Sequence, residues 1–122
     1  MVQNSKSYAL LATLLDELRV EMIGPIRQEL LSGISDKNQY DSLKLRLNAF
    51  IDIPIETKDF ELAAEFANIC RSHGIQGSPT DFQICAIAST YKLAILTEDK
   101  DFERYAQHLP ITLHGREQTL PI

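Results

Sequence analysis

Two acidic residues stand at helix positions where the periodicity of the sequence calls for apolar side chains. Glu29 falls on the inward stripe of a short helix expected after Pro25, and Asp81 heads the stripe of a helix expected after Ser78. The apolar residues that share these stripes are Ile26, Leu30, Ile84, Cys85 and Ala88. Because a buried carboxylate is costly by itself, each position requires a compensating cation or hydrogen bonds.

Each of these two acids also has a simpler interpretation. Ser78 and Asp81 have the spacing of a capping box, and a carboxylate in the first turn is favoured by the helix dipole. Glu29 lies deeper than the first turn, so its alternative is a surface residue on the flank of its helix. The sequence leaves both interpretations open.

A third acidic group follows a short apolar segment that ends at Thr97. Asp99 and Asp101 come directly after it, and ligand sites of open α/β sheets gather at the carboxyl ends of strands. Either aspartate also suits a cap for the helix that begins near Phe102. Taken with Glu29 and Asp81, they mean that three separate segments each bring an acid toward the same edge of a sheet.

Clustered carboxylates without a histidine or cysteine companion suit a hard cation that prefers oxygen ligands, namely magnesium or manganese. Phosphoryl chemistry is the natural use of such a site, because the metal polarises a phosphate and lowers the pKa of an attacking water. The sequence contains no glycine-rich loop of the GxxxxGK type, which argues against an NTPase.

Other reactive side chains lack the surroundings that their chemistry needs. His73, His108 and His114 have no metal-ligand spacing, and Ser78 has no GxSxG elbow around it, which argues against a serine hydrolase. Cys70 and Cys85 lie within apolar helical patterns, so we expect two buried thiols.

Helices and strands alternate along most of the chain, which is typical of an α/β sandwich with a mainly parallel sheet. Pro25 suits the first position of a helix, Gly33 a left-handed stop, and Gly74 the end of a long helix. The expected helices are 8–18, 25–33, 36–50, 59–73, 78–92 and 101–108, and the expected strands are 19–23, 51–55, 93–97 and 111–113. We expect a single domain over residues 1–122.

Length, composition and charge limit the class of protein. With 122 residues and 44% hydrophobic content, the chain can bury one ordinary core, and no apolar run is long enough to span a bilayer. The N-terminus has no secretory signal pattern, so we expect a cytoplasmic protein. A net charge of -5 argues against binding nucleic acid through a broad basic face, but a nuclease whose acids hold a metal stays open.

Three segments of this sequence resemble the PIN domains, and among them the VapC-like toxins of toxin-antitoxin pairs. The segments are residues 24–33 (GPIRQELLSG), 77–88 (GSPTDFQICAIA) and 96–102 (LTEDKDF), and their order and spacing match the family across almost the whole chain. The resemblance implies a three-layer α/β/α sandwich with a mainly parallel central sheet.

The resemblance also implies roles for the acidic residues. Glu29 and Asp81 match the second and third acids of the family, Asp99 or Asp101 matches the fourth, and Thr97 matches the threonine before it. In active members these groups surround one or two magnesium or manganese ions and cleave single-stranded or structured RNA. We assign Glu29, Asp81 and Asp99 to the metal, Asp101 to support of the site or orientation of water, and Thr97 with Ser78 to the substrate. The implied partners are a VapB-like antitoxin, whose tail blocks the site, and a second copy of the chain.

The start of the sequence departs from the family pattern. The family opens with a buried strand that ends in an aspartate, whereas residues 1–8 contain no acid and no apolar strand pattern. We therefore expect the first strand and the first acid to be missing. A sequence that begins too late and a degenerate member that no longer cuts are the two explanations.

Two functions follow from these patterns. The first is a metal-dependent RNA endonuclease that uses the named acids. The alternative is a catalytically impaired PIN-like scaffold, which acts through binding of an antitoxin or another protein and uses its acids as a docking site for arginines.

Overall fold

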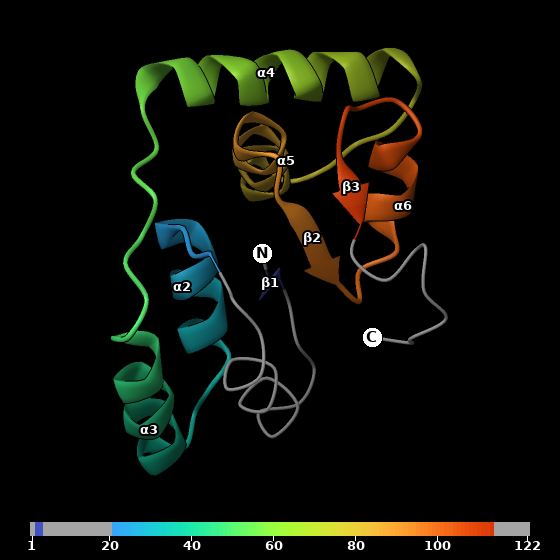
Figure 1. Ribbon diagram of the computed structural model, residues 1–122. Helices are drawn as coiled ribbons and strands as arrows, with labels where there is room; N and C mark the ends of the chain where they lie inside the picture. The colour runs from blue at the N-terminus through green and yellow to red at the C-terminus, as the bar shows by residue number, and fades with distance from the viewer. Residues whose placement is uncertain (1, 4–20, 114–122) are drawn as a thin grey trace. The chain divides into compact units, whose positions relative to one another are not determined.

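The computed structural model describes residues 2–3 and 21–113 of the chain (Figure 1). The chain divides into two compact units, one within Val2–Pro54 and the other within Ile55–Ile122. The helix expected at 8–18, the first residues of the strand expected at 19–23, and His114 with the tail after it lie outside the described residues. Within the described ranges, no helix is both long and apolar enough to cross a membrane.

In its described residues, the N-terminal unit contains a short strand, β1 (Val2–Gln3), and two helices, α2 (Gly24–Ser32) and α3 (Lys37–Leu47). The expectation that the chain has no first strand is therefore wrong, although residues 1–8 still contain no acid. The reason is that a strand depends on its backbone geometry and hydrogen bonds, and two residues adopt these without an apolar run.

Helix α2 forms where the proline and glycine signals placed it. Pro25 lies in the first turn, and Ile26 and Leu30 are buried. Gly33 ends the helix with φ −83°, and its N–H donates to the carbonyl of Leu31. The left-handed conformation expected at Gly33 is therefore wrong. The hydrogen bond from the Gly33 N–H to the Leu31 carbonyl spans fewer residues than an α-helical bond, and it ends the helix without a positive φ.

Helix α3 begins at a side-chain cap and ends earlier than expected. The Asp36 carboxylate accepts hydrogen bonds from the N–H groups of Asn38 at 2.8 Å and Gln39 at 3.3 Å. The helix ends at Leu47, and the strand expected at 51–55 is reduced to an isolated parallel bridge between Met22 and Asp52.

The side chain of Arg27 accounts for the early end of α3. Its Nη1 donates to the Leu47 carbonyl at 2.9 Å, and its Nη2 donates to the Phe50 carbonyl at 2.7 Å. The guanidinium also forms a forked ion pair with Asp52, with Nε–Oδ1 at 3.0 Å and Nη2–Oδ1 at 2.8 Å. Arg27 of α2 therefore satisfies two carbonyls at and just beyond the end of α3, where helical carbonyls lack a partner within the helix.

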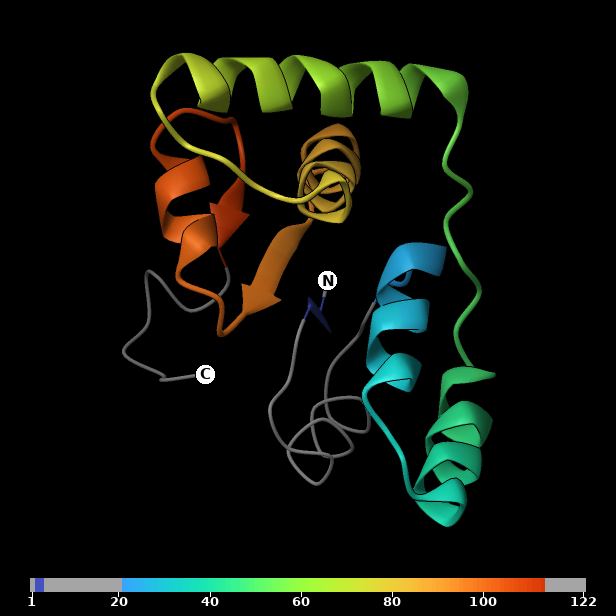
Figure 2. The same ribbon diagram turned by 180° about the vertical axis from the view of Figure 1, so that it is seen from behind.

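Up to Leu113, the C-terminal unit contains three helices and two strands: α4 (Thr57–Ser72), α5 (Pro79–Tyr91), β2 (Ala94–Thr97), α6 (Asp101–Ala106) and β3 (Thr112–Leu113). Strands β2 and β3 pair in parallel, with Ala94 opposite Thr112. Helix α4 packs against α5, as the views from the two sides show (Figures 1 and 2). Gly74 lies just beyond the end of α4 and has a φ of +76°, the left-handed conformation that the sequence predicts for a glycine closing this helix.

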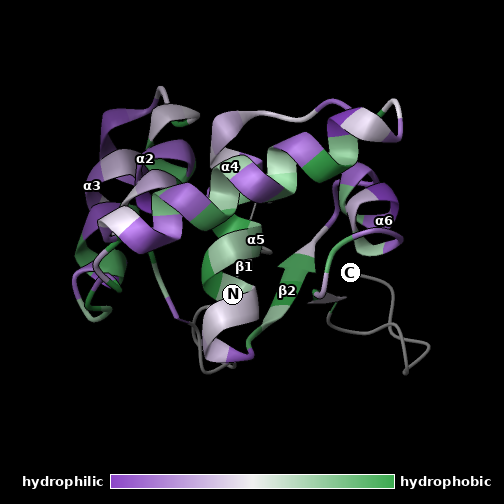
Figure 3. Ribbon diagram, turned by 90° about the horizontal axis from the view of Figure 1, so that it is seen from above, coloured by the Kyte–Doolittle hydropathy of each residue, from purple (hydrophilic) through white to green (hydrophobic). Residues whose placement is uncertain are grey.

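The core of this unit is centred on α5 and β2. Every residue of α5 from Ile84 to Ala88 is buried, as are Ile95 and Leu96 of β2. Figure 3 shows α5 and β2 largely in the hydrophobic colour, whereas α4 alternates between the two colours. A helix that is apolar all round is buried, and an alternating one faces solvent on one side. The expectation of a helix-rich α/β protein with parallel strand pairing is confirmed.

Candidate functional site

Asp81 is a buried acid in the first turn of α5. Its side chain is 8% exposed, and its backbone N–H donates to Ser78 Oγ at 3.1 Å. The cap interpretation of Ser78 is therefore confirmed, and it coexists with burial of the carboxylate. Pro79 at the start of the helix and Ser78 before it are local signals that fix where Asp81 stands.

The Asp81 carboxylate has a partner that the sequence patterns did not reveal. The hydroxyl of Tyr105 in α6 donates to Asp81 Oδ2 at 2.7 Å, and Tyr105 is fully buried. Its ring lies 5.2 Å from that of Phe82 and makes an edge-on contact with that of Phe102 at 5.1 Å. The available signal was that a buried tyrosine needs a partner for its hydroxyl, but the sequence did not say which.

Gly77 makes room for the Tyr105 hydroxyl. A Cβ added at position 77 would overlap the Tyr105 hydroxyl and lie 2.8 Å from its Cζ and 3.0 Å from Cζ of Phe82. Gly77 precedes Ser78, so the cap of α5 and the space for the tyrosine come from adjacent residues. A side chain at position 77 would displace the ring or the loop.

The charge of Asp81 is disfavoured by its surroundings. Burial raises the pKa of its carboxyl group, and the negative charge of Asp99 adds to this rise. Hydrogen bonds from Tyr105 and Ser78 act in the opposite direction. A cation beside Asp81 and Asp99 would offset both the burial and the repulsion, so this part of the site fits a metal that prefers oxygen ligands.

Asp99 lies in the turn that joins β2 to α6. Its N–H donates to Thr97 Oγ1 at 3.0 Å, and its Oδ1 accepts the N–H of Asp101 at 2.9 Å. The cap role expected for one of these aspartates is wrong, because the N-cap residue of α6 is Lys100 without a side-chain cap and the Asp99 side chain instead closes the turn before the helix. Asp101 is half exposed, and its Oδ1 lies 3.6 Å from Arg104 Nη1, in an ion pair of the weak surface kind.

Three aspartates of this unit, Asp81, Asp99 and Asp101, share one neighbour. Burial raises the pKa of Tyr105 most, followed by its bond to Asp81 and by the charges of Asp81, Asp101 and Asp99. The start of α5 and the turn after β2 therefore bring their acids into one electrostatic environment around Tyr105.

Glu29, the remaining predicted ligand, is an exposed residue of α2 in the N-terminal unit. The inward position expected for it is therefore wrong and its alternative, a surface residue on the flank of the helix, is confirmed, because α2 buries the face that carries Ile26 and Leu30. Within residues 2–3 and 21–113, no group of three or more histidine, cysteine, aspartate or glutamate side chains is arranged to hold a metal. The buried acid Asp59 belongs to the capping box of α4, where its Oδ2 accepts the N–H of Glu56 at 2.9 Å.

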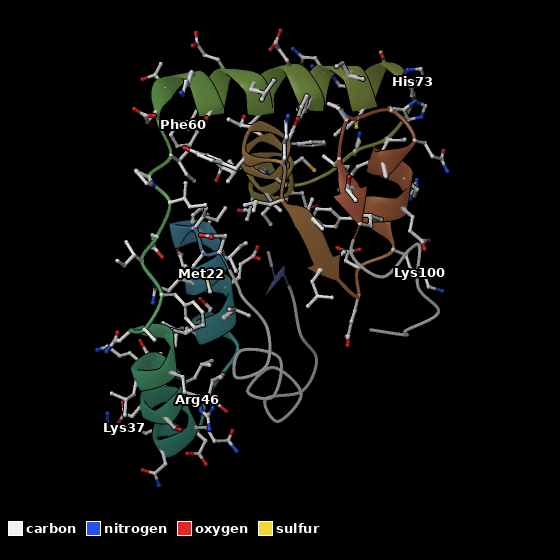
Figure 4. The ribbon with its side chains drawn as sticks, viewed as in Figure 1. Met22, Lys37, Arg46, Phe60, His73 and Lys100 are labelled. Atoms are coloured by element: carbon white, nitrogen blue, oxygen red, sulfur yellow. The ribbon has the colours of Figure 1, made fainter. Side chains whose placement is uncertain are left out.

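The two cysteines are buried, and two of the histidines stack on each other. Cys70 and Cys85 are buried free thiols, and burial raises the pKa of both. His73 stacks on His108, with ring centroids 3.8 Å apart. Figure 4 labels His73 at the C-terminal end of α4 and Lys100 in the turn after β2, where it stands exposed between Asp99 and Asp101.

Comparisons with known proteins agree with the fold. A family model described as the PIN domain matches residues 2–107. The crystal structure of FitAcB from Neisseria gonorrhoeae resembles this one with a TM-score of 0.66, at 18% sequence identity, over 93% of this chain and 96% of that one. None of the curated proteins is similar enough in sequence to match.

Proposed function

Since this chain belongs to the PIN domain family, we propose that it is a metal-dependent RNA endonuclease of the VapC-like toxin type, which hydrolyses phosphodiester bonds. PIN domains are generally nucleases, which supports an enzyme at a coarse level. The observation that carries the proposal is Asp81, a buried carboxylate at the start of α5 whose pKa is raised by burial and by Asp99. Buried acids whose pKa is raised by burial and by a neighbouring charge are candidates for functional sites.

In this proposal Asp81, Asp99 and Glu29 hold magnesium or manganese. The first two are oxygen donors whose mutual repulsion a divalent cation would relieve, and the resemblance adds Glu29. When bound, the metal would polarise the scissile phosphate and lower the pKa of the attacking water.

The protein's own groups prepare this site before any substrate binds. Ser78 fixes Asp81 at the first turn of α5, and Thr97 fixes the turn that presents Asp99. We assign Asp101 to support of the site or orientation of water, and the hydroxyls of Ser78 and Thr97 to orientation of the substrate. These groups act by holding charges and hydrogen bonds in place, which limits the reorganisation needed during reaction.

The proposal includes partners and a location. RNA is the substrate, a VapB-like antitoxin is the inhibitor, and a second copy of the chain forms a homodimer. The cytoplasm is the compartment where such a toxin meets both RNA and antitoxin.

RNA cleavage tests the proposal. Wild type is incubated with magnesium and two probes, a labelled single-stranded RNA of mixed sequence and bulk tRNA, beside D81N and D41N. Asp41 is an exposed α3 residue that pairs with Lys37 at 3.2 Å, so D41N removes an acid from the surface. We expect D81N to lose about 100-fold or more in rate and D41N to keep wild-type activity. Equal activity of all three proteins, or no cleavage by any, would refute the proposal.

The second candidate is the impaired scaffold that acts by binding an antitoxin or another protein. The observation that favours it is the absence of any acid from residues 1–8, where the family pattern places its first aspartate. Titration with magnesium and manganese separates the two candidates. Binding at millimolar concentration or below supports the nuclease, and no binding in that range supports the scaffold.

A further inference from the structure

Tyr105 contributes two separable parts to the C-terminal unit. Its ring belongs to an aromatic group with Phe82 and Phe102, and phenylalanine would serve equally well there. Its hydroxyl makes one described side-chain contact, the 2.7 Å bond to Asp81 Oδ2. The role of the hydroxyl is therefore to bind Asp81, and the packing of the ring does not depend on it.

The position of this hydroxyl is fixed from several sides. Tyr105 is fully buried, and the two neighbouring aromatic rings restrict its own. Gly77 supplies the space that the hydroxyl occupies, which any larger residue would fill. A tyrosine has few torsions to restrict, so a donor held in this way is a rigid reference point for the group that it binds.

The Asp81 carboxylate is correspondingly restricted. The Oγ of Ser78 accepts the backbone N–H of Asp81 at the start of α5, and the hydroxyl of Tyr105, 24 residues further along the chain in α6, donates to its carboxylate. An ionised carboxylate has about four lone-pair sites, so these bonds leave acceptor capacity for a cation. Carboxylates that bind metals are themselves held by hydrogen bonds, and loss of such a bond weakens metal binding.

We infer that Tyr105 is a positioning residue, whose hydroxyl holds the Asp81 carboxylate in the orientation that binds a divalent metal. This inference rests on the proposed function, since it concerns the same acid. It adds a residue of α6 outside the three segments that carry the family resemblance. The site therefore differs from a simple cluster of carboxylates, because one of its carboxylates accepts a hydrogen bond from a buried phenol.

The test compares manganese affinity in four proteins: wild type, Y105F, Y91F and D81N. Y105F removes only the hydroxyl, and Y91F makes the same change at a tyrosine that is 46% exposed. Circular dichroism first checks that each variant is folded at the titration temperature. We expect Y105F to weaken manganese binding by about 10- to 100-fold, and Y91F to bind within about twofold of wild type.

Rescue by excess metal adds a readout that a packing defect would not give. If Tyr105 acts through Asp81, saturating manganese should restore most of the RNA cleavage rate of Y105F. Manganese affinity of Y105F within about twofold of wild type, even with a lower melting temperature, would overturn the inference and leave the hydroxyl a structural role.

The D81N protein distinguishes failure of the proposed function from failure of the inference about Tyr105. If D81N binds manganese as tightly as wild type, the proposed function fails and takes the inference with it. If D81N loses binding while Y105F keeps it, the inference alone fails. If a folded Y105F cannot be obtained, S78A is titrated in its place. Unchanged affinity in S78A would count against positioning by the hydrogen bonds of Asp81, and a loss would support it.

Discussion

The substitution G77A tests the contact between the loop before α5 and the tyrosine of α6. The added Cβ would overlap the Tyr105 hydroxyl, and it would lie 2.8 Å from Tyr105 Cζ and 3.0 Å from Phe82 Cζ. Both rings are buried, so neither can swing into solvent. Overpacking of this kind costs about 1–3 kcal/mol, and displacement of Tyr105 adds about 1.5–3 kcal/mol for the lost bond to Asp81.

We therefore expect G77A to lower the free energy of unfolding by at least about 2 kcal/mol, measured by urea denaturation and by the shift in melting temperature. G33A is the matched control, because a Cβ at Gly33 meets nothing within 4 Å and its φ of −83° suits alanine. Its effect should stay within about 1 kcal/mol of wild type and is expected to stabilise. G77A as stable as G33A would refute the described packing of Tyr105.

Two further predictions concern ionised groups. Burial raises the pKa of Asp81 above its unfolded value, so its contribution to stability is full below the unfolded pKa and is lost as the pH rises through the folded pKa. D81N should therefore be more stable than wild type at pH 7, and urea denaturation should show the gap widening as the pH rises above about 4; a gap that narrows would contradict the burial of this charge. R27K should lower the free energy of unfolding by about 2–4 kcal/mol, because lysine cannot reproduce the bonds to the Leu47 and Phe50 carbonyls. R71K, at an exposed arginine of α4, is its control and should cost less than about 0.5 kcal/mol; equal losses in the two would count against the Arg27 contacts.

The parts of the site that sequence patterns predicted depend on short-range signals. Ser78 and Pro79 start a helix by local capping and backbone geometry, so the place of Asp81 followed from its neighbours. The apolar run of β2 and the aspartates after it predicted the turn that holds Asp99 in the same way.

The parts that were missed depend on contacts between distant residues. Tyr105 reaches Asp81 across 24 positions, and Arg27 reaches Leu47 across 20. Helical periodicity indicates which side of a helix is buried, but it does not say which polar group on another element meets it. For the same reason the end of α3 was expected at Phe50 rather than Leu47, since the sequence of α3 alone contains no sign of Arg27.

The short strand β1 was also missed by the sequence patterns. Two residues carry too little pattern to be recognised, and the apolar alternation that predicts longer strands is absent from residues 1–8. The absence of an acid from residues 1–8 can be read directly from the sequence, and the metal ligands of the proposal are Glu29, Asp81 and Asp99.

If Asp81 serves magnesium-dependent cleavage of RNA, the cleavage rate must depend on both magnesium and this carboxylate. The rate on a labelled single-stranded RNA is measured against magnesium concentration for wild type, D81N and D41N, with a chelator as the zero point. We expect wild type and D41N to share one saturating curve and D81N to stay near the chelator baseline. A D81N curve that matches wild type would contradict this role of Asp81.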